Sequence, residues 1–194
     1  MMAQMSKDDT RLDLAPKIFN MWIFIFTSGM FFAAFTSGFI VYSGGRGHGL
    51  NVIMPNAFLY STILIVFSSG TLFLASKAAK GLQFAKQRMF LWLTFALGIA
   101  FFAMQIYAMY VLTYKMNIFL TDPNASRSFV YIFASMHLIH IIAGLLLLLN
   151  TITATYRKTP QVINLFKMQM SSIFWHFLGI IWIYLYVFLL LNQN

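Results

Sequence analysis

Histidines are the residues of this chain whose types and spacing are best suited to chemistry. His48 lies in a glycine-rich segment, whereas His137, His140 and His176 lie within apolar stretches. His137 and His140 are three residues apart and Gly144 follows four residues later, so a helix would place all three on one face. Neutral imidazoles in such a position are able to bind heme iron or copper.

A second interpretation is that these histidines form hydrogen bonds across helices or to lipid headgroups, as buried polar side chains of membrane helices commonly do. Metal sites usually bring hydrogen-bond acceptors that orient the ligating imidazoles, and no apolar stretch of this chain contains a carboxylate. The residues therefore favour hydrogen bonding, and they predict neither a catalytic nor a metal-binding residue in this chain.

Acidic residues are scarce, and their positions exclude several classes of function. The only carboxylates are Asp8, Asp9, Asp13 and Asp122, and glutamate is absent. Proton pumps and proton-coupled transporters usually need a titratable carboxylate at membrane depth, so we do not expect a self-contained pump. Catalysis by paired carboxylates has no candidates either. The absence of cysteine excludes disulfides, thiolate metal sites and iron–sulfur clusters.

Five long apolar stretches must position these residues. Hydrophobic residues make up 60% of the chain and charged residues 9%, far below the roughly 25% charged residues of a soluble domain. A helix of roughly 20 residues crosses a bilayer with every backbone group paired, which a lipid-exposed strand cannot do. The sequence predicts an all-α, polytopic bundle of five transmembrane helices, in one membrane domain over residues 18–194, at residues 18–42, 56–76, 89–114, 129–156 and 170–191.

The basic residues predict how the bundle is oriented. Residues 1–17 and the loops after the second and fourth stretches contain ten Lys and Arg residues, against three in the other connections. Because basic loops stay in the cytoplasm, we expect residues 1–17 to be a cytoplasmic tail and the C-terminus to lie outside. The net charge of +9 therefore reports topology, and no nucleic-acid partner is expected. Turns are predicted at 43–49 and 122–124.

Small and basic residues mark further candidate contacts. Gly29, Ala33 and Ser37 form a small-residue ridge that would let helices pack closely, within the chain or against another subunit. Lys17, Lys77 and Lys80, near the cytoplasmic boundary, are candidates for contact with anionic headgroups. Ordinary positive-inside topology also accounts for these lysines, and that alternative stays open.

Four motifs, in four successive apolar stretches, resemble one known family. WHFLGIIW at 175–182 is similar to the pattern W-H-F-x-D-x-x-W, and MHLIHIIAG at 136–144 looks like F-H-G-x-H-x-x-x-G. LGIAF at 97–101, followed by Gln105, resembles L-G-x-x-F with a downstream Q-x-x-E. PN at 55–56, followed by SSGT at 68–71, is similar to P-N-T…S-S-x-T. These are patterns of subunit III of heme-copper terminal oxidases, and their order suits its short, five-helix form.

The chain departs from the family pattern at three membrane carboxylates. The glutamate of the family's S-E pair falls at Gly29, the glutamate of Q-x-x-E at Ala108, and the aspartate of the last-helix motif at Gly179. All three are missing together. Any role that the family's subunit plays through those acids, such as tuning proton supply, is therefore in doubt for this chain.

The resemblance implies a subunit that supports the oxidase reaction and binds no heme or copper itself. Heme and copper would lie in partner subunits, with subunit I in direct contact, other oxidase subunits nearby, and phospholipid bound at the surface. A respiratory supercomplex and a bacterial inner membrane are further expectations. Helix packing is expected at Gly144 and at the ridge. Lipid or interhelix polar contacts are expected at His137, His140, Gln105, Trp175 and His176.

Two other functions remain open from the residues. One is an accessory or assembly protein of a related respiratory or nitric-oxide-reducing complex. The other is a small transporter or membrane enzyme unrelated to respiration, against which the lack of intramembrane acids argues.

Overall fold

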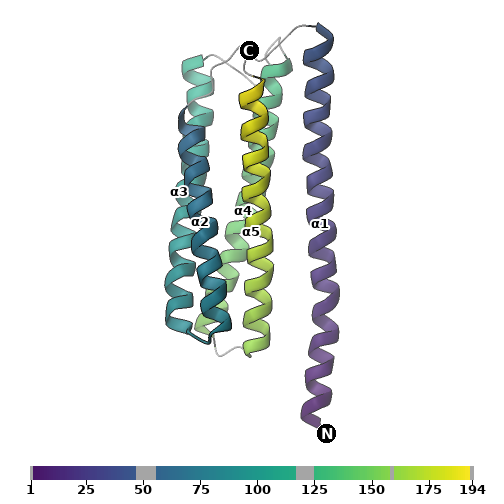
Figure 1. Cartoon of the computed structure of the whole chain (residues 1–194), viewed down its shortest axis with the longest axis vertical. Helices are drawn as coiled ribbons and strands as arrows, with labels where there is room; N and C mark the ends of the chain where they lie inside the picture. Colours follow the sequence, from purple (N-terminus) through teal and green to yellow (C-terminus); the bar gives the residue numbers. More distant parts are fainter. Residues whose placement is uncertain (1, 47–55, 117–124, 158–159, 193–194) are drawn as a thin grey trace.

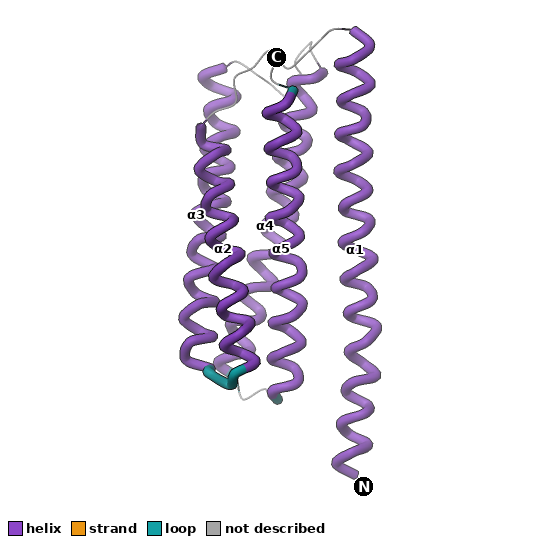
Figure 2. The backbone as a smooth tube through the Cα atoms, in the orientation of Figure 1, coloured by secondary structure: helices purple, strands orange, loops and turns teal. Residues whose placement is uncertain are grey.

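The computed structural model describes residues 2–46, 56–116, 125–157 and 160–192, with side chains described for 14–43, 56–114, 128–157 and 160–192. Helices account for nearly all of the described residues (Figure 2). They are α1 (Met2–Arg46), α2 (Asn56–Lys80), α3 (Phe84–Met116), α4 (Ala125–Tyr156) and α5 (Gln161–Leu191).

The predicted all-α membrane architecture is confirmed. Five helices of the described chain are long and apolar enough to span a membrane. Some bounds differ from those predicted. The apolar span of the last helix begins at Gln161, nine residues before the predicted 170. Polar residues mask this first part of α5 in the sequence, but Asn164 is buried in the structure, where it pairs with a side chain of α3.

The predicted connections fall partly within helices. Helix α1 begins at Met2, so the predicted tail at residues 1–17 continues the first span as helix. The same helix runs to Arg46, into the turn predicted at 43–49. The remainder of that turn, including His48, and the turn at 122–124 lie outside the described residues.

Successive helices run in opposite directions, so that the N-terminus and the C-terminus lie at opposite ends of the molecule (Figure 1). The hairpin of α2 and α3 packs against α4 and α5, while α1 stands at one side and packs, among the described residues, against α4 and α5 only. Helix α5 therefore has α1, α2 and α4 as neighbours. Both buried tryptophans of the core, Trp175 and Trp182, come from α5.

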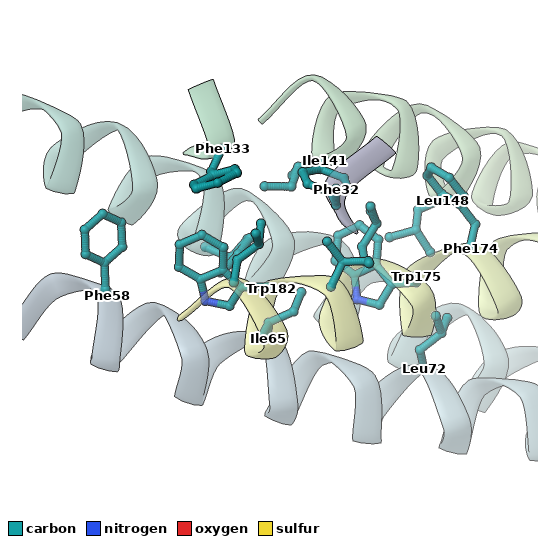
Figure 3. Packing of buried hydrophobic residues seen from close by; sticks show 14 of the residues in the cluster. Phe32, Phe58, Ile65, Leu72, Phe133, Ile141, Leu148, Phe174, Trp175 and Trp182 are labelled. Atoms are coloured by element: carbon teal, nitrogen blue, oxygen red, sulfur yellow. The ribbon is translucent and has the colours of Figure 1, made fainter. Parts of the chain in front are cut away.

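The core consists of aromatic and branched side chains that fill the space between the helices. Trp175 and Trp182 project from α5 into the core, which also includes Ile65 and Phe58 of α2 and Phe133 of α4 (Figure 3). The Trp182 ring lies 5.6 Å from Phe58 and 5.8 Å from Phe101, centroid to centroid, distances typical of favourable aromatic pairs. Since lipid tails are as apolar as these residues, close packing stabilises the bundle more than burial does.

Helix α1 uses an apolar stripe, and not the small-residue ridge, to pack within the chain. Its buried positions recur every three or four residues, as one helical face requires, at Ile25, Ser28, Phe32, Thr36 and Phe39. Ala33 and Ser37 are exposed, and a Cβ added at Gly29 would meet no atom within 4 Å. The ridge thus faces away from the other four helices, so only its predicted packing against another subunit stays open.

Candidate functional site

Trp175 forms the centre of a buried polar cluster that joins three helices. Its indole Nε1 donates a 3.0 Å hydrogen bond to Ser68 Oγ of α2, and Ser68 in turn donates to the Thr94 carbonyl of α3 at 3.4 Å. Gly98 of α3 and Gly144 of α4 lie against the indole, because a Cβ at either position would come within 3.1 Å of it. Two glycines therefore form the slot that fixes the tryptophan ring.

Gln105 and Trp182 extend these contacts along α2. The Gln105 Nε2 donates to Ser61 Oγ at 3.0 Å, and the Trp182 Nε1 donates to Thr62 Oγ1 at 3.0 Å. Ser61, Thr62 and Ser68 thus present a row of hydroxyl acceptors from α2 to its neighbours. The interhelix contacts predicted for Gln105 and Trp175 are present in the structure.

His140 joins α4 to α1. Its Nδ1 lies 2.7 Å from the Met136 carbonyl, which can only accept a hydrogen bond, so Nδ1–H is the donor there. The Nε2 of the same ring lies 3.2 Å from Ser28 Oγ and accepts a hydrogen bond from that hydroxyl. Farther along α1, the Tyr184 hydroxyl of α5 lies 2.8 Å from Thr36 Oγ1. These two hydrogen bonds attach α1 to the rest of the bundle.

His176 joins α5 to α2 at the surface. Its Nδ1 lies 3.2 Å from Ser69 Oγ, and both residues line a shallow groove that also includes Gly179. The predicted interhelix contact is therefore present for His176 as well as for His140.

His137 departs from that expectation. It is 1% exposed, and neither ring nitrogen has a hydrogen-bond partner among the described residues. Its imidazole stacks on Trp182 with centroids 5.2 Å apart, and Phe101 meets it edge to face at 6.1 Å. Aromatic packing holds this histidine in place, where the sequence predicted a polar contact.

The three histidines do not converge on a common point. Within the described side chains, no group of three histidine, cysteine, aspartate or glutamate residues is placed to hold a metal ion. Both nitrogens of His140 are engaged, and His176 lies at the groove between α5 and α2. Among the described residues, the contacts of these histidines serve helix packing.

The three positions that lack the expected carboxylates lie in different environments. Ala108 is fully buried in the core, and Gly29 is open. A Cβ at Gly179 would lie 3.6 Å from Ser69 Oγ, an ordinary contact. The core around Ala108 is closed by apolar side chains, whereas the groove at Gly179 leaves room for a larger residue.

A reciprocal amide pair is the clearest feature that sequence reasoning missed. Gln87 of α3 and Asn164 of α5 are both buried, and each donates its side-chain amide to the other's carbonyl oxygen at 3.2 Å. Nearby, Arg88 donates to the Thr155 carbonyl at 2.6 Å and lies over the Tyr156 ring at 4.6 Å. The sequence predicts Gln87 and Asn164 to lie in connections, because each precedes the apolar stretch of its helix.

The lysines predicted to contact headgroups lie at one end of the molecule. Lys17 is exposed near the start of the first span, and Lys77 and Lys80 are exposed in the last turn of α2. Lys17 lines a cavity between α1, α4 and α5 with Lys167, whose Nζ donates to Asn150 Oδ1 at 3.1 Å. Their contact with lipid stays a prediction.

Comparison with known proteins gives the family. No family model matches the chain. It is 31% identical over 172 residues to subunit 3 of the cytochrome bo(3) ubiquinol oxidase of Pseudomonas aeruginosa, covering 86% of this chain and 80% of the relative. The chain belongs to the subunit III family of heme-copper terminal oxidases. The resemblance noted in the four motifs is thereby confirmed.

Other members of the family extend the match to nearly the whole chain. Cytochrome c oxidase subunit 3 of Alkalihalophilus pseudofirmus is 27% identical over 176 residues, 88% of this chain and 84% of that protein. A cytochrome bo(3) ubiquinol oxidase subunit 3 of Buchnera aphidicola is 27% identical over 192 residues, 96% of this chain and 92% of that protein. The relatives include subunits of both cytochrome c and ubiquinol oxidases, so membership of this family does not identify the electron donor.

Proposed function

We propose that this chain is the structural, lipid-binding subunit III of a proton-pumping heme-copper terminal oxidase that reduces oxygen to water. It binds no heme and no copper; both reside in partner subunits. It contacts subunit I directly, stabilises it and sustains proton uptake into it. The complex lies in an energy-transducing membrane, the inner membrane of a bacterium, with the N-terminus of this chain in the cytoplasm.

The observation that carries this proposal is similarity to oxidase subunit 3 over at least four fifths of both chains. The side-chain chemistry supports it. Trp175, Gln105 and His140 direct their polar atoms to neighbouring helices within the chain. A chain whose buried polar groups hold its own helices together, and whose spans carry no carboxylate, fits a supporting subunit better than an independent pump.

The outer surface supports an association with partners in the membrane. Apolar side chains are exposed along every helix, and on α1 they flank the ridge of Gly29, Ala33 and Ser37. Small-residue ridges let the backbones of neighbouring membrane helices approach closely. The end of the bundle that contains the α2–α3 turn is rich in lysine, which supports a cytoplasmic location for this end.

Affinity purification of the tagged chain in mild detergent tests the proposal. The expected result is recovery of a heme-bearing subunit I, a reduced-minus-oxidised heme spectrum, and oxygen consumption. A matched preparation of the chain expressed without its partners serves as control and is expected to be colourless. Recovery of the chain with other membrane proteins but without heme would favour an assembly role instead. A heme spectrum from the chain alone would contradict the proposal.

A further inference from the structure

The turn between α2 and α3 forms a groove at the basic end of the molecule. Helix α2 ends in two hydrogen bonds, from the Gln83 N–H to the Ala78 carbonyl at 3.0 Å and from the Leu82 N–H to the Ala79 carbonyl at 3.3 Å. Leu82 adopts the left-handed conformation that such a helix end requires, with φ of 56°. This tight turn brings the last turns of α2 and the first turns of α3 together.

Each helix contributes one face to the groove. Leu74, Lys77 and Ala78 come from α2, Lys86 and Phe90 come from α3, and Gly81 and Gln83 come from the turn between them. Leu74 lies three and four positions before Lys77 and Ala78, and Lys86 lies four positions before Phe90, the spacing of residues on one helical face. They enclose a cavity of about 280 Å³.

The groove is polar at one end and apolar at the other. Lys77, Lys86 and Gln83 lie toward the turn, while Leu74 and Phe90 lie farther along their helices, toward the middle of the spans. An ammonium group near the membrane boundary attracts phosphate, and an apolar wall below it accommodates an acyl chain. The polar and apolar ends of the groove match those of a phospholipid, with the headgroup at the lysines and the acyl chains along Leu74 and Phe90.

The surrounding helices offer the two lysines no negative charge. Helices α2, α3, α4 and α5 contain no aspartate and no glutamate anywhere in their sequences. Asp8, Asp9 and Asp13 belong to α1, which does not pack against α2 or α3 among the described residues, and Asp122 follows the opposite end of α3. No neighbouring element therefore offers Lys77 or Lys86 a carboxylate.

We propose that the groove between α2 and α3 binds one anionic phospholipid, with Lys77, Lys86 and Gln83 at its phosphate. The inference rests on the proposed function to the extent that the chain lies in a membrane with this end at the headgroup layer. An acidic segment of a partner protein would satisfy the lysines, but it would leave the apolar wall of Leu74 and Phe90 without a matching surface.

The test uses the intact oxidase complex in nanodiscs, with a photoactivatable phosphatidylglycerol or a photoactivatable phosphatidylcholine as the probe. We expect phosphatidylglycerol to label the peptide spanning residues 74–90 more strongly than phosphatidylcholine does. In the double variant Lys77→Gln/Lys86→Gln, the ratio of labelling by phosphatidylglycerol to labelling by phosphatidylcholine should fall. We expect a fall of about fivefold for each lysine removed, since one basic side chain near an anionic headgroup contributes about 1 kcal/mol.

Two control variants isolate the groove. Arg157→Gln removes one positive charge from the same end without touching the lining, and it should retain the preference for phosphatidylglycerol that Lys86→Gln alone weakens. Gly81→Phe adds an aromatic ring to the groove lining without changing charge, and it should abolish the preference for phosphatidylglycerol. A Cβ at Gly81 meets its nearest atom at an ordinary 3.6 Å.

Several outcomes would overturn the proposal. These are equal labelling by the two lipids, equal loss of the preference in Lys86→Gln and Arg157→Gln, displacement by soluble glycerol phosphate, or crosslinking of the lysines to an acidic partner segment. The heme spectrum and oxygen consumption of the same preparation distinguish a failure of the lipid-binding proposal from a failure of the proposed function. A complex with normal heme and no lipid preference rejects the groove alone, whereas absence of heme rejects the oxidase assignment.

Discussion

The indole of Trp175 and the hydroxyl of Ser68 form a buried 3.0 Å hydrogen bond that joins α5 to α2. The two residues are 107 positions apart in the sequence. Because the Ser68 hydroxyl donates a hydrogen bond to the Thr94 carbonyl, Ser68 also links this contact to α3. The last helix is thus fixed at its centre by a polar contact within an otherwise apolar core.

We expect Trp175→Phe to lower the free energy of unfolding by more than the loss of one interhelix hydrogen bond, about 0.6 kcal/mol, because the smaller ring also leaves a cavity beside Gly98 and Gly144. Ser68→Ala keeps the ring but leaves its buried indole N–H without an acceptor, which should cost about 1–3 kcal/mol. Unfolding of the purified chain in mixed micelles, followed by circular dichroism, measures both. A cost of no more than about 0.6 kcal/mol for Trp175→Phe would show that the ring's shape contributes nothing.

The glycine slot makes a second prediction. A Cβ at Gly98 would lie 2.7 Å from the Trp175 ring, and the buried, hydrogen-bonded indole has little freedom to move. Gly98→Ala is therefore expected to destabilise the chain by about 1–3 kcal/mol, as overpacking of a filled core does. Gly179→Ala is the matched control, because its Cβ has only ordinary contacts. Thermal melts of the two variants should differ, and identical melting temperatures would contradict the slot.

The amide pair of Gln87 and Asn164 makes a third prediction, since each side chain satisfies the other in a buried position. Gln87→Leu or Asn164→Leu alone leaves one buried amide without its partner and should cost about 1–3 kcal/mol. The double variant removes both amides and should cost less than the sum of the two single changes. A double-mutant cycle in mixed micelles gives this coupling. Additive costs would mean that the two amides act independently.

His137 and His140 are predicted to respond in opposite ways to the same substitution. His137→Phe keeps the stack on Trp182 and removes two buried nitrogens that lack partners, so stability should stay equal or rise. His140→Phe removes the bond to Ser28 and should loosen α1. Protease cleavage between α1 and α2 in the purified oxidase measures the loosening. The heme content per complex should be unchanged in both variants, and its loss would contradict a packing role.

The sequence by itself determined the class of this protein and the number of its spans. Sixty per cent hydrophobic residues in five long stretches leave no soluble alternative, because backbone groups in lipid must pair within a helix. The motifs around His137, His140 and Trp175 were sufficient to suggest the family, and the spacing of basic residues was sufficient to predict an orientation. These properties depend on local composition and order, which a sequence displays directly.

Only the tertiary structure decided which polar residues meet. In the sequence His137 and His140 look alike and share one helical face. In the structure His137 stacks on Trp182 and His140 forms a hydrogen bond with Ser28, because the two positions meet different neighbouring helices. Nothing local indicates that Asn164 pairs with Gln87 or that the ridge at Gly29 faces outward. Pairing between distant residues depends on how helices rotate and approach one another, and close packing of whole side chains sets that rotation.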